Sequence, residues 1–236
     1  MADNADALRE AADTMRAVRE RCPWSQQITH RDLVPYLIEE SHEVIDAVES
    51  GTRADLREEL GDLLWQVLFH SAIAAQDPDD PFDIDDVAQT LTEKMVRRHP
   101  HVFADAVANT PEEVLVHWNA AKAAEKRARK SVLDGVPRGM PALALAQKLV
   151  GRAASAGVTL PEPASIPEPT RSVPEPTRSL PEPVEGSNIA APASEAELGD
   201  ALLALVARAR QSGWDAERAL RERLRMLEDE VRAAEE

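Results

Sequence analysis

Apolar side chains recur every three or four residues in separate blocks along the chain, which is the spacing of amphipathic helices. The blocks predict helices over residues 5–20, 33–48, 56–75, 84–98 and 110–130, with loops at 22–30 and 77–83. Gly51 stands where a helix favours glycine, just past its end. Thr52 and Asp55 form a capping-box pattern that opens the next helix. That helix is apolar almost all round after Leu63, so we expect it to be central and buried.

Composition agrees with an all-α fold. The chain is 43% hydrophobic but only 3% aromatic, and its nine glycines are scattered. Its 43 acidic and 27 basic residues give a net charge of −16, which disfavours binding to a nucleic-acid polymer. The single cysteine, Cys22, cannot form an internal disulfide. The N-terminal residues do not resemble a signal peptide and the apolar runs are too short for a membrane span, so we expect a cytoplasmic protein without membrane contact.

The second half of the chain changes character. Residues 157–193 are rich in proline and repeat the letters PEPTRS, which predicts a disordered, partly polyproline II linker. A docking site for a proline-binding domain is the alternative. Helical periodicity returns at Ser194 and continues to the end. There the segment AELGDAL at 196–202 repeats EELGDLL at 58–64, so the tail resembles the second half of a duplicated unit.

The turn at Gly51 joins two helices that must run antiparallel. Glu43 lies eight residues before this turn and Glu59 eight after it, so the two should face each other. Glu40 lies eleven residues before the turn and Asp62 eleven after it. Each helix therefore contributes two carboxylates to one face, and the four should converge.

Glu40 is the most informative of the four, because it falls between Leu37 and Val44 in the apolar arc of its helix. A carboxylate there is costly unless something compensates its charge. A divalent cation would do so, and ligands that are all oxygen favour Mg²⁺ or Mn²⁺. The alternative is a solvated acidic face paired with nearby arginines. A di-iron site would need a second Glu-x-x-His motif, and this hairpin has one only, at Glu39 to His42.

Basic residues gather on the later helices. Lys94, Arg97 and Arg98 lie close together near the end of the helix predicted at 84–98, and Lys122 and Lys126 follow at a spacing of four. Together with a metal, such a cluster could clamp a polyphosphate. The alternative for the two arginines is a favourable interaction with the helix dipole.

Several motifs, in the same order, resemble the MazG nucleoside triphosphate pyrophosphohydrolases. They are CPW at 22–24, EExxE at 39–43, EELGDLLWQV at 58–67, RRHPHVF at 97–103 and HWNAAKAAEK at 117–126. The resemblance implies an all-α fold in which the hairpins of two subunits form a four-helix bundle across a homodimer. It also implies Mg²⁺-dependent hydrolysis of nucleoside triphosphates to the monophosphate and pyrophosphate, in clearance of the nucleotide pool.

The resemblance assigns roles to individual residues. Glu40, Glu43, Glu59 and Asp62 would hold Mg²⁺, with Mn²⁺ as a substitute, and Glu39 would join Glu40 in catalysis by orienting water. The substrate would contact a larger set, in which both tryptophans could equally be packing residues: Trp24, Lys94, Arg97, Arg98, Trp118, Lys122 and Lys126. The loop CPWSQQITH departs from the usual CPWDxxQTH at Ser25 and Ile28.

The resulting domain prediction has four parts. Residues 1–135 form the catalytic MazG domain, 136–156 a connecting helical segment, 157–193 the linker, and 194–236 a truncated second MazG-like unit. This second unit keeps Glu197 and Asp200 but lacks an EExxE segment, so we expect it to be inactive. Two other functions remain open: a related all-α phosphohydrolase specific for dUTP or phosphoribosyl-ATP, and a helical interaction protein without catalysis.

Overall fold

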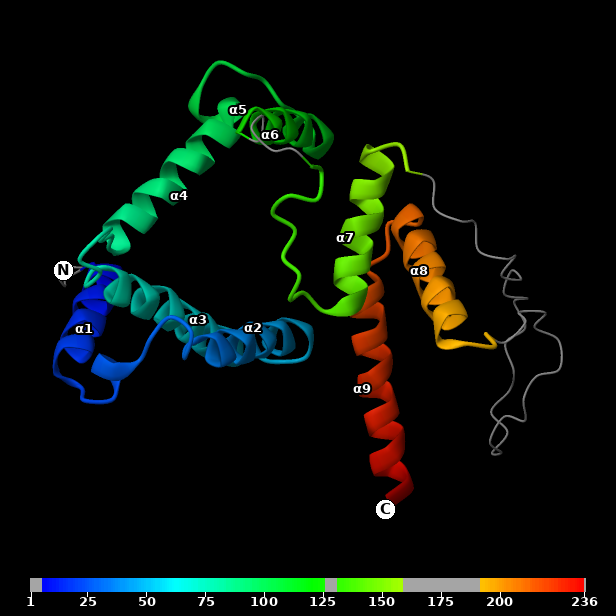
Figure 1. Cartoon of the computed structure of the whole chain (residues 1–236), viewed down its shortest axis with the longest axis horizontal. Helices are drawn as coiled ribbons and strands as arrows, with labels where there is room; N and C mark the ends of the chain where they lie inside the picture. Colours follow the sequence, from blue (N-terminus) through cyan, green and yellow to red (C-terminus); the bar gives the residue numbers. More distant parts are fainter. Residues whose placement is uncertain (1–5, 126–130, 159–191, 236) are drawn as a thin grey trace. The chain divides into compact units, whose positions relative to one another are not determined.

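The computed structural model describes residues 6–125, 131–158 and 192–235, and all regular structure in these ranges is helical (Figure 1). The chain divides into two compact units, Met1–Lys126 and Arg127–Glu236. The all-α expectation is confirmed. None of the helices described is both long and apolar enough to cross a bilayer.

The first unit contains five helices of more than four residues and two short turns of helix. In chain order they are α1 (Ala7–Arg21), η1 (Ser25–Gln27), α2 (Val34–Glu49), α3 (Arg53–Ala74), α4 (Ile84–Arg98), α5 (Pro100–Phe103) and α6 (Pro111–Glu125). The predicted helices all exist, with ends within a few residues of those expected. The exception is the last part of the block at 110–130, since residues 126–130 lie outside the described ranges.

Local sequence explains where these helices begin. The Thr52 hydroxyl accepts from the Ala54 and Asp55 amides, and the Asp55 carboxylate accepts from the Thr52 amide at 2.7 Å, so the expected capping box opens α3. A second capping box, not anticipated from the sequence, joins Asp83 and Asp86 at the start of α4. Pro100 ends α4 and also begins α5, where its missing N–H costs nothing.

Glycine is needed at position 51 for a different reason from the one expected from the sequence. Its φ is not left-handed. A Cβ added there would instead lie 2.7 Å from the Cα of Ala47 and 3.0 Å from its carbonyl oxygen. The glycine is therefore needed because the chain leaves α2 in close contact with the preceding turn, which lets α3 fold back at once.

The core of this unit forms where α1 crosses α3. Phe69, Met15 and Leu33 are at most 1% exposed, and Leu68 and Ala12 complete the buried cluster. The expectation that α3 is buried all round is only partly right. Val67 and Leu60 are 41% and 50% exposed, because α1 and α2 leave part of the surface of α3 uncovered within one chain.

The second unit consists of α7 (Ala142–Ser155), α8 (Glu195–Gln211) and α9 (Ala216–Glu235). The tail was expected to be helical from Ser194 to the end, but Gly213 interrupts it with a left-handed φ of 73°. The Trp214 amide then bonds back to the Ala209 carbonyl at 2.8 Å, and the Asp215 carboxylate caps the start of α9. The predicted linker lies mainly outside the described residues.

Candidate metal centre

The α2–α3 hairpin brings three carboxylates together. One oxygen each of Glu40, Glu43 and Glu59 lies within 4.8 Å of the others, as the ligands of a single ion would. Two of them, Glu40 and Glu43, come from consecutive turns of α2, and Glu59 comes from the facing turn of α3. The turn at Gly51 sets this register, as the equal spacing on both sides of it predicted.

Asp62, the fourth expected ligand, acts on this group at longer range. Burial is the main reason that the pKa of Glu40 is raised, and the charges of Asp62 and Glu43 raise it further. Burial likewise leads the rise in the pKa of Glu59, followed by the charges of Glu43 and Asp62. The site therefore holds its carboxylates in an environment where negative charge is unfavourable, which is the condition that a bound cation would relieve.

Gln66 also belongs to this site, although the sequence analysis did not single it out. Its Nε2 donates to Glu40 Oε1 at 3.4 Å, and its side chain is buried. Gln66 follows Glu59 by seven residues, so both lie on one face of α3. That spacing was the available signal, but a glutamine within an apolar stretch is easily read as a packing residue.

Farther along the same face, His70 stacks on His30 from the loop before α2. The ring planes are 5° apart and the two Nδ1 atoms are 2.7 Å apart. Burial lowers the pKa of His70, and the nearby His30 lowers it further. This pair continues the polar side of the hairpin beyond Gln66 and fixes the loop to α3.

The remaining predicted residues of the hairpin region have separate positions. Glu39 is exposed on α2 and is not one of the three clustered carboxylates. Trp24 is 51% exposed and packs edge-on against Tyr36 and Phe69. A substrate could reach its free face. Ser25 is buried, however, and its carbonyl accepts from Arg19, so this departure from the family pattern faces the interior.

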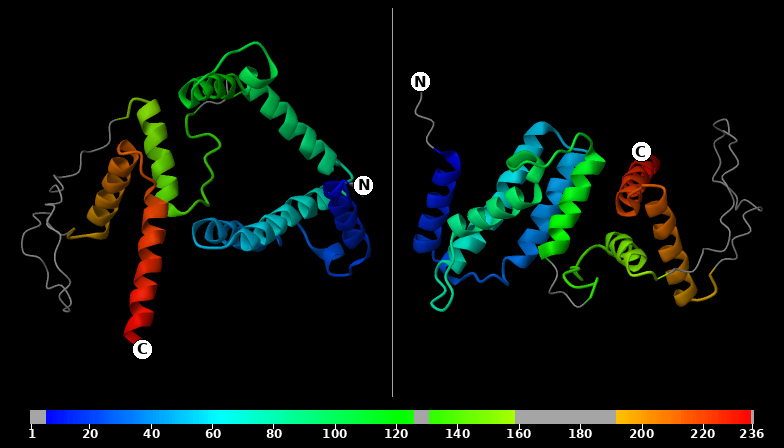
Figure 2. Two further views of the ribbon diagram at one scale, coloured as in Figure 1. Left: turned by 180° about the vertical axis from the view of Figure 1, so that it is seen from behind. Right: turned by 90° about the horizontal axis from the view of Figure 1, so that it is seen from above.

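The expected basic cluster is not beside the carboxylates within one chain. α4 begins near the end of α3 and then diverges from the hairpin, so its last turn lies with α5 and α6 (Figures 1 and 2). Glu125 binds Arg97 at 2.8 Å and Arg98 at 2.5 Å. The Arg98 guanidinium also lies 4.8 Å from the ring centre of Trp118. Both arginines and this tryptophan thus join α4 to α6.

Three lysines were also expected to contact the substrate. Lys94 and Lys122 are half-buried on α4 and α6. Lys126 lies outside the described residues. The clustering of basic residues predicted one phosphate clamp with the metal, but in the described part of one chain the last turn of α4 lies with α5 and α6 and not beside the carboxylates.

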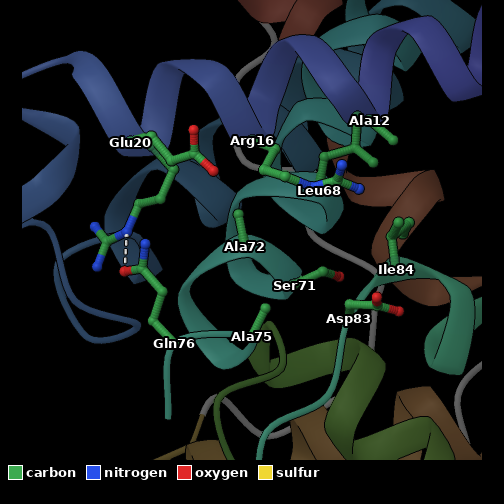
Figure 3. Close-up of a pocket in the computed structure, with 11 residues that line it drawn as sticks. Ala12, Arg16, Glu20, Leu68, Ser71, Ala72, Ala75, Gln76, Asp83 and Ile84 are labelled. Atoms are coloured by element: carbon green, nitrogen blue, oxygen red, sulfur yellow. Dashed lines mark hydrogen bonds between the residues drawn. The ribbon is translucent and has the colours of Figure 1, made fainter.

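A pocket of about 280 Å³ lies between α1 and the end of α3 (Figure 3). Its walls include Arg16, Ser71 and Asp83, and Arg19 Nε donates to Gln76 Oε1 at 2.9 Å on one side. Ser71 follows Glu59 by twelve residues, which turns it about 120° around the helix from the carboxylate face. This pocket is therefore separate from the metal centre.

In the second unit, Glu197 corresponds to Glu59 but has a different structural role. The Glu197 carboxylate accepts from the Ala193 amide at 2.7 Å, while the Ser194 hydroxyl accepts from the Glu197 amide. Glu197 thus lies in the first turn of α8 and caps it, whereas Glu59 lies in the second turn of α3 and faces α2.

Comparison with known proteins places these features in a family. Residues 28–103, which include the whole hairpin, match the MazG nucleotide pyrophosphohydrolase domain. A Streptomyces cacaoi protein described as an uncharacterized 26.1 kDa protein in the blaB 3'region is 55% identical over 153 residues, covering 65% of this chain and 63% of that protein. The nucleoside triphosphate pyrophosphohydrolase of Mycobacterium tuberculosis is 51% identical over 153 residues, 65% of this chain and 46% of its own.

These two matches leave much of each relative uncovered, so the chain spans about half to two thirds of their length. A crystal structure of a mazG-related protein from Thermotoga maritima aligns with 48% of this chain and 97% of its own, at 27% identity and a TM-score of 0.43. The nucleoside triphosphate pyrophosphohydrolase/pyrophosphatase MazG of Thermotoga maritima is 36% identical over 218 residues, which cover 92% of this chain and 80% of that protein. The chain therefore belongs to the MazG family.

Proposed function

We propose that this protein hydrolyses nucleoside triphosphates, ribo or deoxy, to the monophosphate and pyrophosphate, and so removes unwanted nucleotides from the pool. The carrying observation is the group of three carboxylates from α2 and α3, whose oxygens lie within 4.8 Å of one another. The relatives from Mycobacterium tuberculosis and Thermotoga maritima described above are named as nucleoside triphosphate pyrophosphohydrolases, which supports this proposal.

The donor set fits Mg²⁺ or Mn²⁺. All of its atoms are carboxylate oxygens, which hard divalent cations prefer, and there is no thiolate or imidazole among the three. Burial raises the pKa values of Glu40 and Glu59, and neighbouring carboxylates raise them further, a cost that a bound cation would offset. When bound there, the cation would supply Lewis-acid activation of water and neutralise charge on the phosphates.

The protein's own groups would position the reactants. Glu40, Glu43 and Glu59 would hold the cation, with Asp62 completing the site at its edge. Glu39 is exposed on α2, one residue from Glu40, and would orient the attacking water. Gln66 would keep the Glu40 carboxylate in place through its amide.

We propose that Lys94 is the main contact for the substrate phosphates and that Lys122 is a weaker one. The Arg98 guanidinium is already held by Glu125 and Trp118, and Arg97 shares Glu125 with it. These arginines would reach a substrate only by leaving Glu125. Trp24, with an open face, is the better of the two tryptophans for stacking on the base.

We propose further that the hairpin pairs with that of a second copy in a homodimer. Ile38, Val48 and Leu60 are 55%, 65% and 50% exposed on the hairpin, which is unfavourable for a surface in water. A four-helix bundle of two hairpins would cover such residues. It would also place other helices near the carboxylates, where α4 of the same chain does not reach.

The test is hydrolysis of the eight standard nucleoside triphosphates and of dUTP with Mg²⁺, with pyrophosphate and orthophosphate measured separately. Wild type should release pyrophosphate in a metal-dependent way, and Glu40→Ala should lose that activity. Glu58→Ala, an exposed carboxylate one residue from Glu59, is the matched control and should remain active. Turnover of dUTP alone would favour the narrower phosphohydrolase. No turnover and no stabilisation by metal would refute the proposal and favour a non-catalytic protein.

A further inference from the structure

Helix α9 carries an apolar stripe that the described part of the second unit leaves exposed. Leu220, Leu224, Leu227 and Val231 are each between 46% and 49% exposed. Their spacing of four, three and four residues places them within about 60° of one another on the helix, as in the seam of a coiled coil.

The first turn of α9 is fixed to α7. The Ala216 amide donates to Gln147 Oε1 at 3.1 Å, and Glu217 Oε2 accepts from the Ala144 amide at 3.3 Å. Beyond that turn α9 continues past the N-terminal end of α7, as Figure 1 shows. The stripe begins just after this turn, at Leu220.

Charged residues flank the stripe in a particular order. On one flank lie Arg221 and Glu228, and on the other lie Arg223 and Glu230. Each flank therefore has an arginine toward the start of the helix and a glutamate seven residues later. Within one copy, Arg223 forms an ion pair with Glu230 at 3.4 Å and Arg221 with Glu217 at 3.6 Å, so pairs between two copies would replace these.

We propose that α9 pairs with α9 of a second copy as an antiparallel coiled coil. In this arrangement Leu224 lies opposite Leu227 of the second copy, and Leu220 lies opposite its Val231. All four layers of the stripe are then filled. In an antiparallel pair, each flank also faces the same flank of the second copy. Each arginine therefore lies beside a glutamate.

Charge decides the orientation. The antiparallel pair joins Arg223 to Glu230 and Arg221 to Glu228, each twice by symmetry, which gives four pairs of opposite charge. A parallel pair in register would join Arg223 to Glu228 but would place Glu230 against Glu235. The second arrangement combines attraction with repulsion, whereas the first has attraction only.

This surface is distinct from the hairpin and does not depend on the proposed activity. Pairing through α9 would give residues 194–236 a role in self-association. Glu197 in this segment caps α8. The alternative is that another part of the same chain covers the stripe. Disulfide trapping distinguishes this from pairing with a second copy.

The experiment uses the full chain with Cys22→Ser to remove the native thiol. With Leu220→Cys and Val231→Cys added together, mild oxidation should convert most of the protein into a covalent dimer on a non-reducing gel. With Leu220→Cys alone it should not. The two copies of position 220 are then eleven residues apart along the pair, about 16 Å, beyond the reach of a disulfide.

A charge test keeps the inference falsifiable if the cysteines disturb folding. In the double-cysteine background, Arg223→Glu should slow crosslinking roughly tenfold by creating two repulsive pairs, and adding Glu230→Arg should restore it. Arg218→Glu, on the opposite side of α9, is the control and should have no effect. Circular dichroism verifies that each variant is folded. Equal crosslinking through Leu220→Cys alone, no crosslinking of the folded double variant, or insensitivity to Arg223→Glu would each overturn the antiparallel pair.

Discussion

Gln66 on α3 donates its amide N–H to the Glu40 carboxylate on α2, with 3.4 Å between nitrogen and oxygen. The amide is 3% exposed and has little freedom to move, so it holds the one carboxylate of the cluster that lies in the apolar arc of its helix. Glu40 is therefore placed by a buried neighbour as well as by the backbone of its own helix. In metal sites such neighbours orient the ligands and influence affinity.

Replacing this amide should weaken metal binding without unfolding the protein. Gln66→Leu keeps the side-chain volume but loses the hydrogen bond, so the Kd for Mn²⁺ should rise about tenfold. Titration calorimetry measures this. Gln89→Leu breaks a comparable bond to Glu93 on the exposed side of α4, at 2.8 Å, and should leave the Kd unchanged. Equal effects of the two substitutions would count against a positioning role.

Glu40→Gln should stabilise the metal-free protein at neutral pH while abolishing stabilisation by metal. Burial and the charges of Asp62 and Glu43 raise the pKa of Glu40, so its ionised form is unfavourable in the folded state. Removing the charge relieves that cost and raises Tm. In wild type, metal at 100 times Kd should add about 2.7 kcal/mol. Thermal melts with and without Mg²⁺ test both statements, and a metal-dependent shift retained in the variant would argue against Glu40 as a ligand.

The ion pair that joins α6 to α4 should be sensitive to acid. Hydrogen bonds from Arg98 and then Arg97 lower the pKa of Glu125 from 4.5 to about 2. A lowered pKa means that the stabilisation is fully present above pH 4.5 and is lost as the pH falls towards 2. Glu125→Gln should therefore have a lower Tm than wild type at pH 7, and the gap should narrow between pH 4.5 and 3. A gap independent of pH would show that the charge of Glu125 is unimportant.

Two glycines of the hairpin should respond in opposite ways to alanine. At Gly51 the new Cβ would lie 2.7 Å from the Ala47 Cα, so Gly51→Ala should lower the free energy of unfolding by about 1–3 kcal/mol. At Gly61, inside α3, a Cβ meets nothing within 4 Å. Gly61→Ala should therefore raise it by about 0.5–1 kcal/mol through helix propensity. Denaturant unfolding followed by circular dichroism compares the two, and stabilisation by both would contradict the close contact at Gly51.

Much of the local structure could be predicted because it depends on neighbours in the chain. The spacing of apolar residues located the helices, and the Thr52–Asp55 pattern located the start of α3. The equal distances of Glu43 and Glu59 from Gly51 predicted that their carboxylates would meet. Helix geometry and a tight turn are enough for these inferences, since both act over a few residues.

Other features were hidden because they depend on which surfaces meet. Gln66 looks like a core residue until α2 places Glu40 beside it. Arg98 looks like a phosphate ligand until α6 brings Glu125 and Trp118 to it. Neither partner is near in the sequence, so no local pattern identifies the contact.

The sequence by itself determined the helical class, the family and the carboxylate register of the hairpin, because periodicity, motifs and turn length are written in adjacent residues. Only the tertiary structure decided that α4 diverges from the hairpin and that the apolar stripe of α9 has no cover among the described residues of its own unit. These outcomes depend on how distant helices pack, and packing is decided by the fit of whole surfaces.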